Sequence, residues 1–366
     1  MVNVGNKIPL SRQVAQHLKQ KMQQGIYQSG SMLPSVRKLR DDFGVSTNVI
    51  YRAMRELEEN GLVQSHHGKG TMVQENNRVA RTAILFAFIQ PYPASTPFEQ
   101  RVIQYAEEGF SARGNLMVFR SSQLDVALER EIAEHAINNG VQGILLWPVE
   151  NNPNGPFFEK LSQKVPIVLV DRLLDNAKLP AVIFDTYEAG KDICREMLEV
   201  KNRKRMLCII DDLKISPYKN LMQGLRDQAK IIGRSDDLTI IQLELSKFIE
   251  QINNNDFSAV NHFKEDVEKL ITKGGYDTIF SPQDQFLKHV IVETGLHDQL
   301  NDIQLVDIFT PNASPQARQY NKSGVLHWIL DFPQLIEKAN DMLQRIVLTG
   351  NANNEIVNIK VRQSQL

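Results

Sequence analysis

The sequence predicts a small head of three helices and a two-stranded hairpin, followed by a larger two-lobed α/β body with parallel sheets. Residues 8–73 show amphipathic helical stripes separated by glycines. From residue 82 onward, continuous apolar runs alternate with amphipathic helices, a pattern typical of parallel sheets covered on both faces. The chain has 366 residues, which is enough for two or three domains with well-buried cores.

Composition indicates a globular protein and excludes several other classes. Hydrophobic residues make up 42% of the chain and charged residues 23%. The longest apolar run, near residues 83–89, is too short for a membrane-spanning helix. The first residues show no apolar export signal, and Cys194 and Cys208 are the two cysteines. We therefore expect a cytoplasmic protein without a disulfide framework.

The elements of the head follow from apolar spacing and glycine breaks. A first helix is expected over residues 8–24, where apolar residues recur every four positions. A second helix ends at Gly44, and a third begins after Ser46, which can cap it, and ends at Gly61. Residues 62–73 predict a hairpin with a glycine-rich tip. This order predicts a winged helix-turn-helix.

Charge separates the head from the body. Residues 1–75 contain ten basic and six acidic residues, so they carry a net charge of +4. The whole chain has a net charge of −1, which leaves −5 for the remainder. A basic head on an acidic body favours nucleic-acid binding through the head.

Polar side chains on the second helix, the third helix and the wing form the candidate DNA surface. We expect Asn48 to pair with an adenine edge, and Arg52 to contact guanine or phosphate. The alternative is that these charges only solvate helix faces. The candidate DNA-binding residues are Ser35, Arg37, Lys38, Ser46, Thr47, Asn48, Tyr51, Arg52, His66, His67, Gly68, Lys69 and Gly70.

The body is expected to be a doubly covered α/β unit over residues 82–366, joined to a head at 1–75 by a polar linker at 76–81. Lobe crossovers are predicted near residues 184, 310 and 331. The expected strands are 82–89, 115–119, 142–147, 166–170, 181–184, 205–210, 238–243, 277–280, 303–309 and 325–330. The expected helices lie near 98–112, 125–139, 187–200, 217–232, 258–273, 284–294 and 332–349.

Candidate ligand-binding residues lie where these strands end, because parallel sheets bind ligands at their carboxyl edges. Aromatic faces can stack on a ligand ring, and charged groups can bind polar ligand groups in pairs. For Phe98 and Trp147 the alternative is ordinary core packing. The candidates are Phe98, Trp147, Glu150, Asp171, Arg172, Tyr218, Lys219, Gln283, Asp284 and Asp307.

Asp171 and Arg172 follow the buried strand 166–170 and allow two interpretations. They could form a structural ion pair at the strand end. Alternatively, they could be open to water before ligand binds and then contact adjacent hydroxyls. We expect the second arrangement, in which replacing Arg172 would change ligand affinity but leave the stability of the ligand-free chain nearly unchanged.

The head resembles the GntR family of bacterial transcription factors, and the match is ordered and correctly spaced. It implies that Arg37 contacts DNA, whereas the arginines that the family usually has near Thr47 and Tyr51 are absent here. The matching segments are 33–39 (LPSVRKL), 44–46 (GVS), 52–53 (RA), 57–58 (LE), 61–63 (GLV) and 68–71 (GKGT).

The body is similar to the lactose/galactose-repressor and periplasmic sugar-binding superfamily, and the whole chain looks like the arabinose-repressor subgroup. This resemblance implies a repressor that acts as a homodimer on double-stranded operator DNA and responds to a sugar, with Asp171 and Arg172 contacting it. Leu221 replaces a common family arginine. The matching segments are 96–98 (TPF), 142–146 (QGILL), 165–172 (VPIVLVDR), 182–185 (VIFD) and 281–284 (SPQD).

Two other functions remain open at this point. One is a carbohydrate-processing enzyme built on the α/β body, and the other is a plain sugar-binding protein fused to a winged helix. The sequence shows no catalytic triad, phosphate loop or zinc spacing. We therefore expect no catalytic residue, no metal site, no cofactor and no membrane partner.

Overall fold

A computed structural model divides the chain into two compact units, Met1–Ala83 and Ile84–Leu366. The structure describes residues 9–23, 26–59, 61–66, 70–74, 83–299, 302–311 and 324–364. The predicted linker at 76–81 lies outside these described residues, as do His67, Gly68 and Lys69 of the predicted wing tip. Within the described part, no helix combines the length and apolarity needed to cross a membrane.

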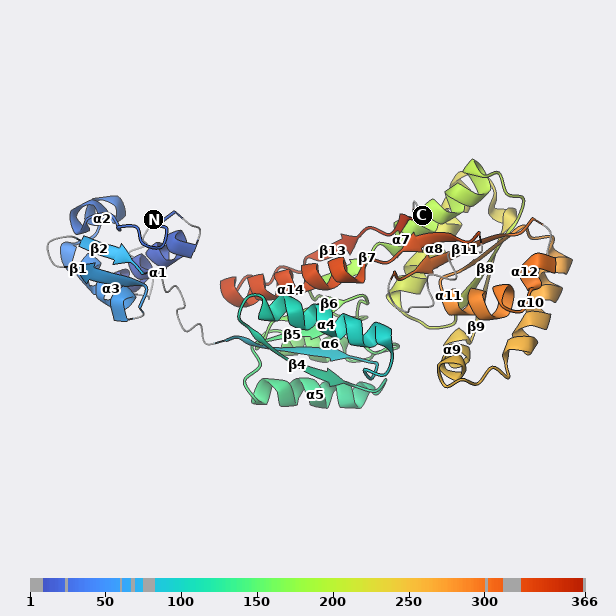
Figure 1. Ribbon diagram of the computed structural model, residues 1–366, viewed down its shortest axis with the longest axis horizontal. Helices are drawn as coiled ribbons and strands as arrows, with labels where there is room; N and C mark the ends of the chain where they lie inside the picture. The colour runs from blue at the N-terminus through green and yellow to red at the C-terminus, as the bar shows by residue number, and fades with distance from the viewer. Residues whose placement is uncertain are drawn as a thin grey trace. The chain divides into compact units, whose positions relative to one another are not determined.

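The head is a winged helix-turn-helix with its own apolar core (Figure 1). The Ser35 hydroxyl caps α2 by accepting from the Lys38 N–H at 3.3 Å, and Gly44 ends that helix with a φ of 63°. The two wing strands pair antiparallel, with Val63 opposite Val73. Its elements are α1 (Leu10–Gln23), α2 (Val36–Phe43), α3 (Thr47–Glu59), β1 (Val63–His66) and β2 (Gly70–Val73).

The first lobe of the body is a six-stranded parallel sheet in the order β13-β7-β6-β5-β3-β4. Helices α4 and α14 pack on one face and α5 and α6 on the other, so the central strands are apolar on both sides (Figure 1). Its elements are β3 (Leu85–Gln90), α4 (Pro97–Ser111), β4 (Leu116–Ser121), α5 (Val126–Asn138), β5 (Gly143–Leu146), α6 (Gly155–Leu161), β6 (Ile167–Val170), β7 (Ala181–Phe184), α14 (Phe332–Thr349) and β13 (Ile356–Ile359).

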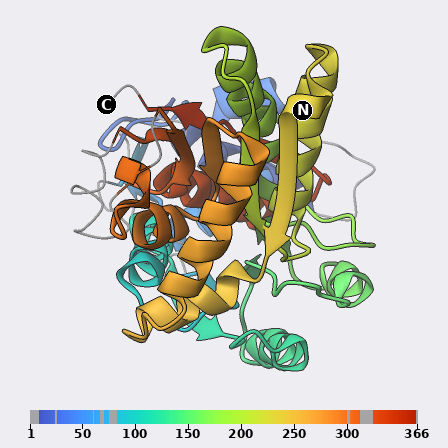
Figure 2. The same cartoon turned by 90° about the vertical axis from the view of Figure 1, so that its right-hand side faces the viewer.

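The second lobe is a six-stranded sheet in the order β14-β12-β11-β10-β8-β9, parallel except for the last pair, β12 with β14. Figure 2 faces this lobe, with its gold to orange helices beside the strands. Its elements are α7 (Thr186–Arg195), η1 (Glu196–Val200), β8 (Met206–Asp211), α8 (Ser216–Ile231), η2 (Ser235–Asp237), β9 (Leu238–Leu243), α9 (Leu245–Asn253), α10 (Val260–Gly274), β10 (Thr278–Ser281), α11 (Asp284–Phe286), η3 (Leu287–Val292), α12 (Leu296–Gln299), β11 (Gln304–Phe309), β12 (Leu326–Ile329) and β14 (Arg362–Gln363).

The chain passes between the lobes at three places. It leaves the first sheet after Phe184 and returns after Ile329, near the predicted positions 184 and 331. A crossover near 310 is not where the chain changes lobe, because β11 and β12 flank that position and pair in the same sheet. The third passage lies at residues 360–361, between β13 of the first sheet and β14 of the second.

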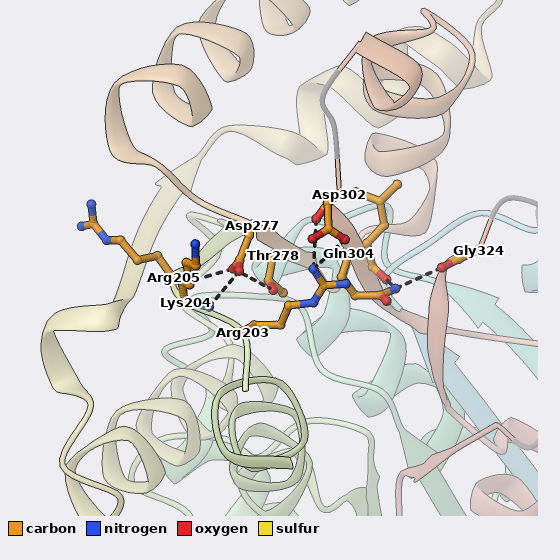
Figure 3. A network of polar contacts seen from close by, with 9 residues as sticks. Arg203, Lys204, Arg205, Asp277, Thr278, Asp302, Gln304 and Gly324 are labelled. Carbon is orange, nitrogen blue, oxygen red and sulfur yellow. Dashed lines mark hydrogen bonds and ion pairs between the residues drawn. The ribbon is translucent and has the colours of Figure 1, made fainter. Parts of the chain in front are cut away.

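A polar network ties together the amino ends of the second lobe's strands (Figure 3). The Asp277 carboxylate accepts from the backbone N–H groups of Lys204 and Arg205, at 2.8 and 3.1 Å. Arg203 reaches the carbonyl oxygen of Asp302 at 3.0 Å. These contacts lie at the opposite end of the strands from the candidate ligand site, so we assign them to strand alignment.

Candidate DNA interface and effector site

The head presents free basic side chains on α2 and α3. Arg37 and Lys38 are exposed on the first turn of α2, and Arg52 is exposed on α3. Among the described residues, no carboxylate lies within ion-pair distance of these three, whereas Arg12, Arg40 and Arg55 each pair with an acid at 3.8, 2.6 and 3.0 Å. The unpaired cations are therefore available to phosphate or base edges.

The amino-terminal turn of α3 presents the polar face that a recognition helix needs. Ser46, Thr47 and Asn48 are exposed, and Tyr51 is 59% exposed one turn later. The Ser46 carbonyl accepts from the backbone N–H groups of Val49 and Ile50 and so starts the helix. A large exposed aromatic residue beside small polar ones suits contact with a nucleic-acid groove.

The described part of the wing is anchored to the rest of the head. The Glu58 carboxylate accepts from the backbone N–H of Ser65 at 2.8 Å, which joins α3 to β1. Gly70 has a φ of 106°, a backbone conformation that residues with a side chain rarely adopt, so glycine is favoured at this position of the wing. His66 is partly buried, and its role in DNA contact stays a prediction.

Arg172 is the centre of the candidate effector site in the first lobe. Its guanidinium donates to the Tyr92 hydroxyl at 2.6 Å and to the Pro148 carbonyl at 3.3 Å. The Arg172 Nε lies 3.5 Å from Asp171 Oδ2, and the two side chains are only 7% and 12% exposed. The prediction that this pair is open to water is therefore wrong, because the loops after three neighbouring strands close around it.

The backbone at Asp171 has a φ of 65°, the left-handed region that a residue with a side chain rarely adopts. The conformation is fixed because the N–H of Asp171 donates to Val182 at 3.0 Å and that of Arg172 donates to Val170 at 2.7 Å. Burial raises the pKa of Asp171, and the adjacent Arg172 charge opposes that rise. Such backbone strain is typical of functional sites.

A second set of polar groups lies where the strands of the second lobe end. Gln283 donates to the Tyr218 hydroxyl at 2.9 Å. Burial raises the pKa of Tyr218, and the Asp211 carboxylate adds to that rise. The Arg172 charge lowers the pKa of Tyr218, so the polar groups of the two lobes lie within electrostatic reach of one another.

The buried carboxylates Asp211 and Asp307 and the partly buried Asp284 belong to this same edge of the second sheet. Burial raises the pKa of Asp211 to about 6, and Ser246 Oγ donates to Asp211 Oδ2 at 2.6 Å. Burial and the nearby Asp307 raise the pKa of Asp284 to about 6. Asp307 itself is fully buried and lies 2.7 Å from the His327 Nδ1.

Two contacts join the lobes directly beside this site. The backbone N–H of Leu173 donates to Ser216 Oγ at 2.9 Å, and Lys219 lies 3.6 Å from Asp175. A small cleft at this junction is lined by residues of both lobes, among them Glu150, Arg172, Ser216 and Lys219. The carboxyl edges of the two sheets therefore face a shared space, which is where parallel sheets bind small molecules.

Comparison with protein families decides the class of the body. A family model described as a periplasmic binding protein domain matches residues 86–351, well over half of the chain. The chain belongs to this family. The head matches the bacterial regulatory proteins of the gntR family over residues 10–73. A DNA-binding head on a periplasmic binding protein domain makes the chain a transcriptional regulator.

Individual relatives agree with this architecture. The chain is 27% identical to the Exu regulon transcriptional regulator of Escherichia coli over 220 residues, which cover 54% of this chain and 84% of that protein. It is 21% identical to the arabinose metabolism transcriptional repressor of Geobacillus stearothermophilus over 206 residues, 54% of this chain and 55% of the relative.

A solved structure shows the same fold. It is a periplasmic binding protein/LacI transcriptional regulator from Alkaliphilus metalliredigens QYMF complexed with D-xylulofuranose. The two chains superpose with a TM-score of 0.59 at 15% identity, over 77% of this chain and 98% of that one. At this identity the likeness establishes the two-lobed fold of the periplasmic binding protein domain.

Not all predicted ligand residues of the periplasmic binding protein domain share the cleft. Trp147 is 4% exposed and packs edge-on against Tyr92 and Phe98, with ring centroids 6.0 and 6.4 Å apart. Phe98 lines a separate small hollow with Phe332 and Thr310. For these two aromatic residues the structure favours packing, whereas Glu150, Arg172 and Lys219 do line the cleft.

Sequence reasoning missed several polar residues at the site. Tyr92 and Ser216 make contacts that span 80 and 43 residues, which no local pattern reveals. Asp211 is the last residue of the apolar strand β8, much as the predicted Asp171 directly follows the apolar strand β6. That signal was available in the sequence. Gln90, fully buried at the end of β3, is a further omission of the same kind.

Proposed function

We propose that this regulator is a cytoplasmic repressor that binds operator DNA as a homodimer and responds to a sugar held between the two lobes. The observation that carries the proposal is the cleft between the lobes, which Glu150 and Arg172 of the first lobe and Ser216 of the second line together. The polar groups of Tyr218 and Asp211 lie within electrostatic reach of it. Sugar hydroxyls are suited to such a site because each can both donate and accept a hydrogen bond.

The relatives support the proposal that the chain is a repressor and that it responds to a sugar. One matched protein is by name a repressor of arabinose metabolism, and the matched solved structure carries a bound sugar. In the proposed mechanism the sugar contacts both lobes, stabilises their closed arrangement and thereby changes the spacing of the two heads in the dimer. A coupling of about 1–3 kcal/mol is enough for useful induction.

We propose that the exposed polar face of α3 reads the operator in the major groove, with Asn48 and Arg52 at base edges. Arg37 and Lys38 contact phosphates, and the wing approaches the neighbouring backbone or minor groove. The predicted wing residues His66, His67, Gly68, Lys69 and Gly70 belong to this proposal. No catalytic step is assigned to the body.

The test starts from the operator. Genomic footprinting with the full chain identifies bound sites, and fluorescence anisotropy then measures operator affinity with and without each sugar of a panel. We expect one sugar to raise the melting temperature and to change operator affinity, without being consumed. Turnover of that sugar by the purified chain would contradict the proposal and favour an enzyme.

A further inference from the structure

Near the carboxyl ends of the body's strands, three buried acceptor oxygens have no hydrogen-bond donor among the residues that the structure describes. They are Gln90 Oε1, Glu150 Oε2 and Asp211 Oδ1, and each follows or ends a strand whose carboxyl end faces the site. Gln90 and Asp211 are fully buried. Buried acceptors are normally satisfied, so these three point to a missing partner that supplies donors.

The orientation of the Gln90 amide is fixed by its other contact. Its Nε2 donates to the Tyr92 carbonyl at 2.9 Å, so turning the amide over would set two acceptors against each other. Asp211 is similarly constrained, because Ser246 already occupies Oδ2 and leaves Oδ1 open. The open positions at Gln90 and Asp211 are therefore acceptors by geometry. Two buried donors of the first lobe, Trp147 Nε1 and Arg172 Nε, have no hydrogen-bond acceptor among the described residues, so the missing partner must accept as well as donate, as a hydroxyl group does.

The charges around the site also disfavour an anion. Glu150, Asp171 and Asp211 supply carboxylates, and Asp284 and Asp307 add two more along the second sheet's edge. The one buried guanidinium of the cleft, that of Arg172, is already bound to the Tyr92 hydroxyl, the Pro148 carbonyl and Asp171. An added phosphate or carboxylate would meet these carboxylates, while the charge of the buried Arg172 is already compensated by Asp171.

Two lysines line the cleft, but they do not offset the excess of carboxylates deeper in the site. Lys214 and Lys219 are both exposed, so water screens their charges. Lys219 is also paired with Asp175 at 3.6 Å. A ligand group that reaches the depth of the site meets acceptors and carboxylates rather than these cations.

We infer that the effector is an uncharged sugar with free hydroxyl groups, and that the site rejects phosphate esters and sugar acids. The inference rests on the proposed sugar response and narrows its ligand class. Hydroxyl groups donate to Gln90, Glu150 and Asp211 and leave no net charge to bury. A phosphate or carboxylate offers acceptors where acceptors already stand.

The first experiment compares matched ligands on the full chain. Calorimetric titration uses neutral pentoses and hexoses, each beside its own phosphate ester and its own uronic or aldonic acid, and operator release is measured with the same set. We expect a neutral sugar to bind at least 100-fold more tightly than either charged partner. Tightest binding and operator release by a charged sugar would overturn this inference but leave the sugar-responsive regulator standing. Release by no sugar of either class would overturn both.

The second experiment changes the charge of the site. In Asp211→Asn, the affinity ratio between the neutral sugar and its phosphate should narrow at least tenfold, because one repelling carboxylate is removed. Glu150→Gln makes the same test from the first lobe, should Asp211→Asn fail to fold. Glu268→Gln, on the exposed face of α10, is the matched control and should keep the original ratio. An unchanged ratio in both site variants would overturn the inference.

Discussion

The Arg172 guanidinium binds three groups that would lose their partner without it. Removing one member of a buried, paired set leaves the other charge uncompensated. We therefore expect Arg172→Ala to lower the free energy of unfolding of the ligand-free chain by about 3 kcal/mol, because Asp171 stays buried. Sugar affinity should fall as well, by about 2 kcal/mol, since a charged hydrogen bond is lost.

Urea unfolding and calorimetric titration of the same variant measure both effects. Arg345→Ala is the matched control, because Arg345 forms an ion pair with Glu355 in which the side chains are 53% and 41% exposed. Exposed pairs of this kind contribute about 0–1 kcal/mol. If Arg172→Ala lowers the free energy of unfolding no more than Arg345→Ala does, the ion pair of Arg172 with Asp171 is open to water in solution.

Asp211 gives a pH-dependent stability with a defined sign. Its pKa is raised from 3.8 to about 6 by burial, so the native chain binds this proton more tightly than the unfolded chain does. The favourable contribution of Asp211 to the free energy of unfolding is present below pH 4 and is lost as the pH rises through 6. Asp211→Asn should therefore stabilise the ligand-free chain at pH 7.5 by about 1–3 kcal/mol.

The difference in free energy of unfolding between Asp211→Asn and the parent should shrink toward pH 4, because the native carboxyl is protonated there and the unfolded carboxyl, with its pKa of 3.8, begins to be protonated as well. Urea unfolding at pH 4.5, 6 and 7.5 measures the trend. If the free energies of unfolding of Asp211→Asn and the parent differ by the same amount at all three pH values, the Asp211 carboxylate is solvated in the native chain. A buried carboxylate that lowers the stability of the chain at neutral pH fits a binding role.

Arg37 permits a test of the DNA interface that does not depend on knowing the operator sequence. Because we assign it to phosphate, Arg37→Ala should weaken specific and non-specific binding alike. The slope of log K against log salt should decrease by about 0.9. Titrations at several salt concentrations measure the slope, with Arg12→Ala as the control because Arg12 is paired with Glu56. An unchanged slope would reject the phosphate assignment.

Helices α7 and α8 cross at a very short distance, and this crossing positions the residues that the second lobe contributes to the site. A Cβ on Gly224 would lie 2.0 Å from the Tyr187 carbonyl oxygen, and one on Gly190 would lie 2.4 Å from the Leu221 carbonyl oxygen. Backbone atoms cannot turn aside as a side chain can. The two glycines therefore fix the position of α8, whose first turn holds Ser216, Tyr218 and Lys219.

We expect Gly224→Ala to separate α7 from α8 and to cost about 1–3 kcal/mol of stability through overpacking. Sugar affinity should fall as well, because the first turn of α8 moves. Lys230→Ala, an exposed change on the same helix, is the control and should alter neither quantity. Thermal unfolding and titration measure both. A stable Gly224→Ala with normal affinity would show that the helices accommodate the methyl group.

Most helices and strands were predictable from the sequence because the apolar pattern within each segment is enough to indicate its type. The central strands are apolar on both faces, and every strand expected between 82 and 330 is present. Strands β13 and β14 were missed since they are short and lie among polar residues. Helix α9 was missed although Leu245, Phe248 and Ile252 mark one face of it. At the site, the order of the chain located Asp171 and Arg172, but their burial depends on Tyr92 and Pro148, which approach from other strands.

At the scale of the whole molecule, the proposed mechanism links sugar binding and operator binding through one conformational equilibrium. If sugar weakens operator binding by a given factor, operator must weaken sugar binding by the same factor. We expect that factor to be about 5–150, which corresponds to 1–3 kcal/mol. Calorimetric titration of sugar into the chain, with and without saturating operator, measures it. Two unequal factors would show that a further binding event, such as a change of oligomeric state, is involved.

The three passages between the lobes have a consequence for biosynthesis. The first lobe begins at β3 but cannot be completed until α14 and β13 have been made, after nearly all of the second lobe. During translation its strands β5, β6 and β7 therefore present an apolar face that α14 has not yet covered. The head, by contrast, is a contiguous amino-terminal unit and can fold first. A nascent chain on the ribosome thus carries a folded DNA-binding head while the domain proposed to bind the sugar is still incomplete. Premature release of such a chain would yield a head that binds DNA but lacks the domain that responds to the sugar.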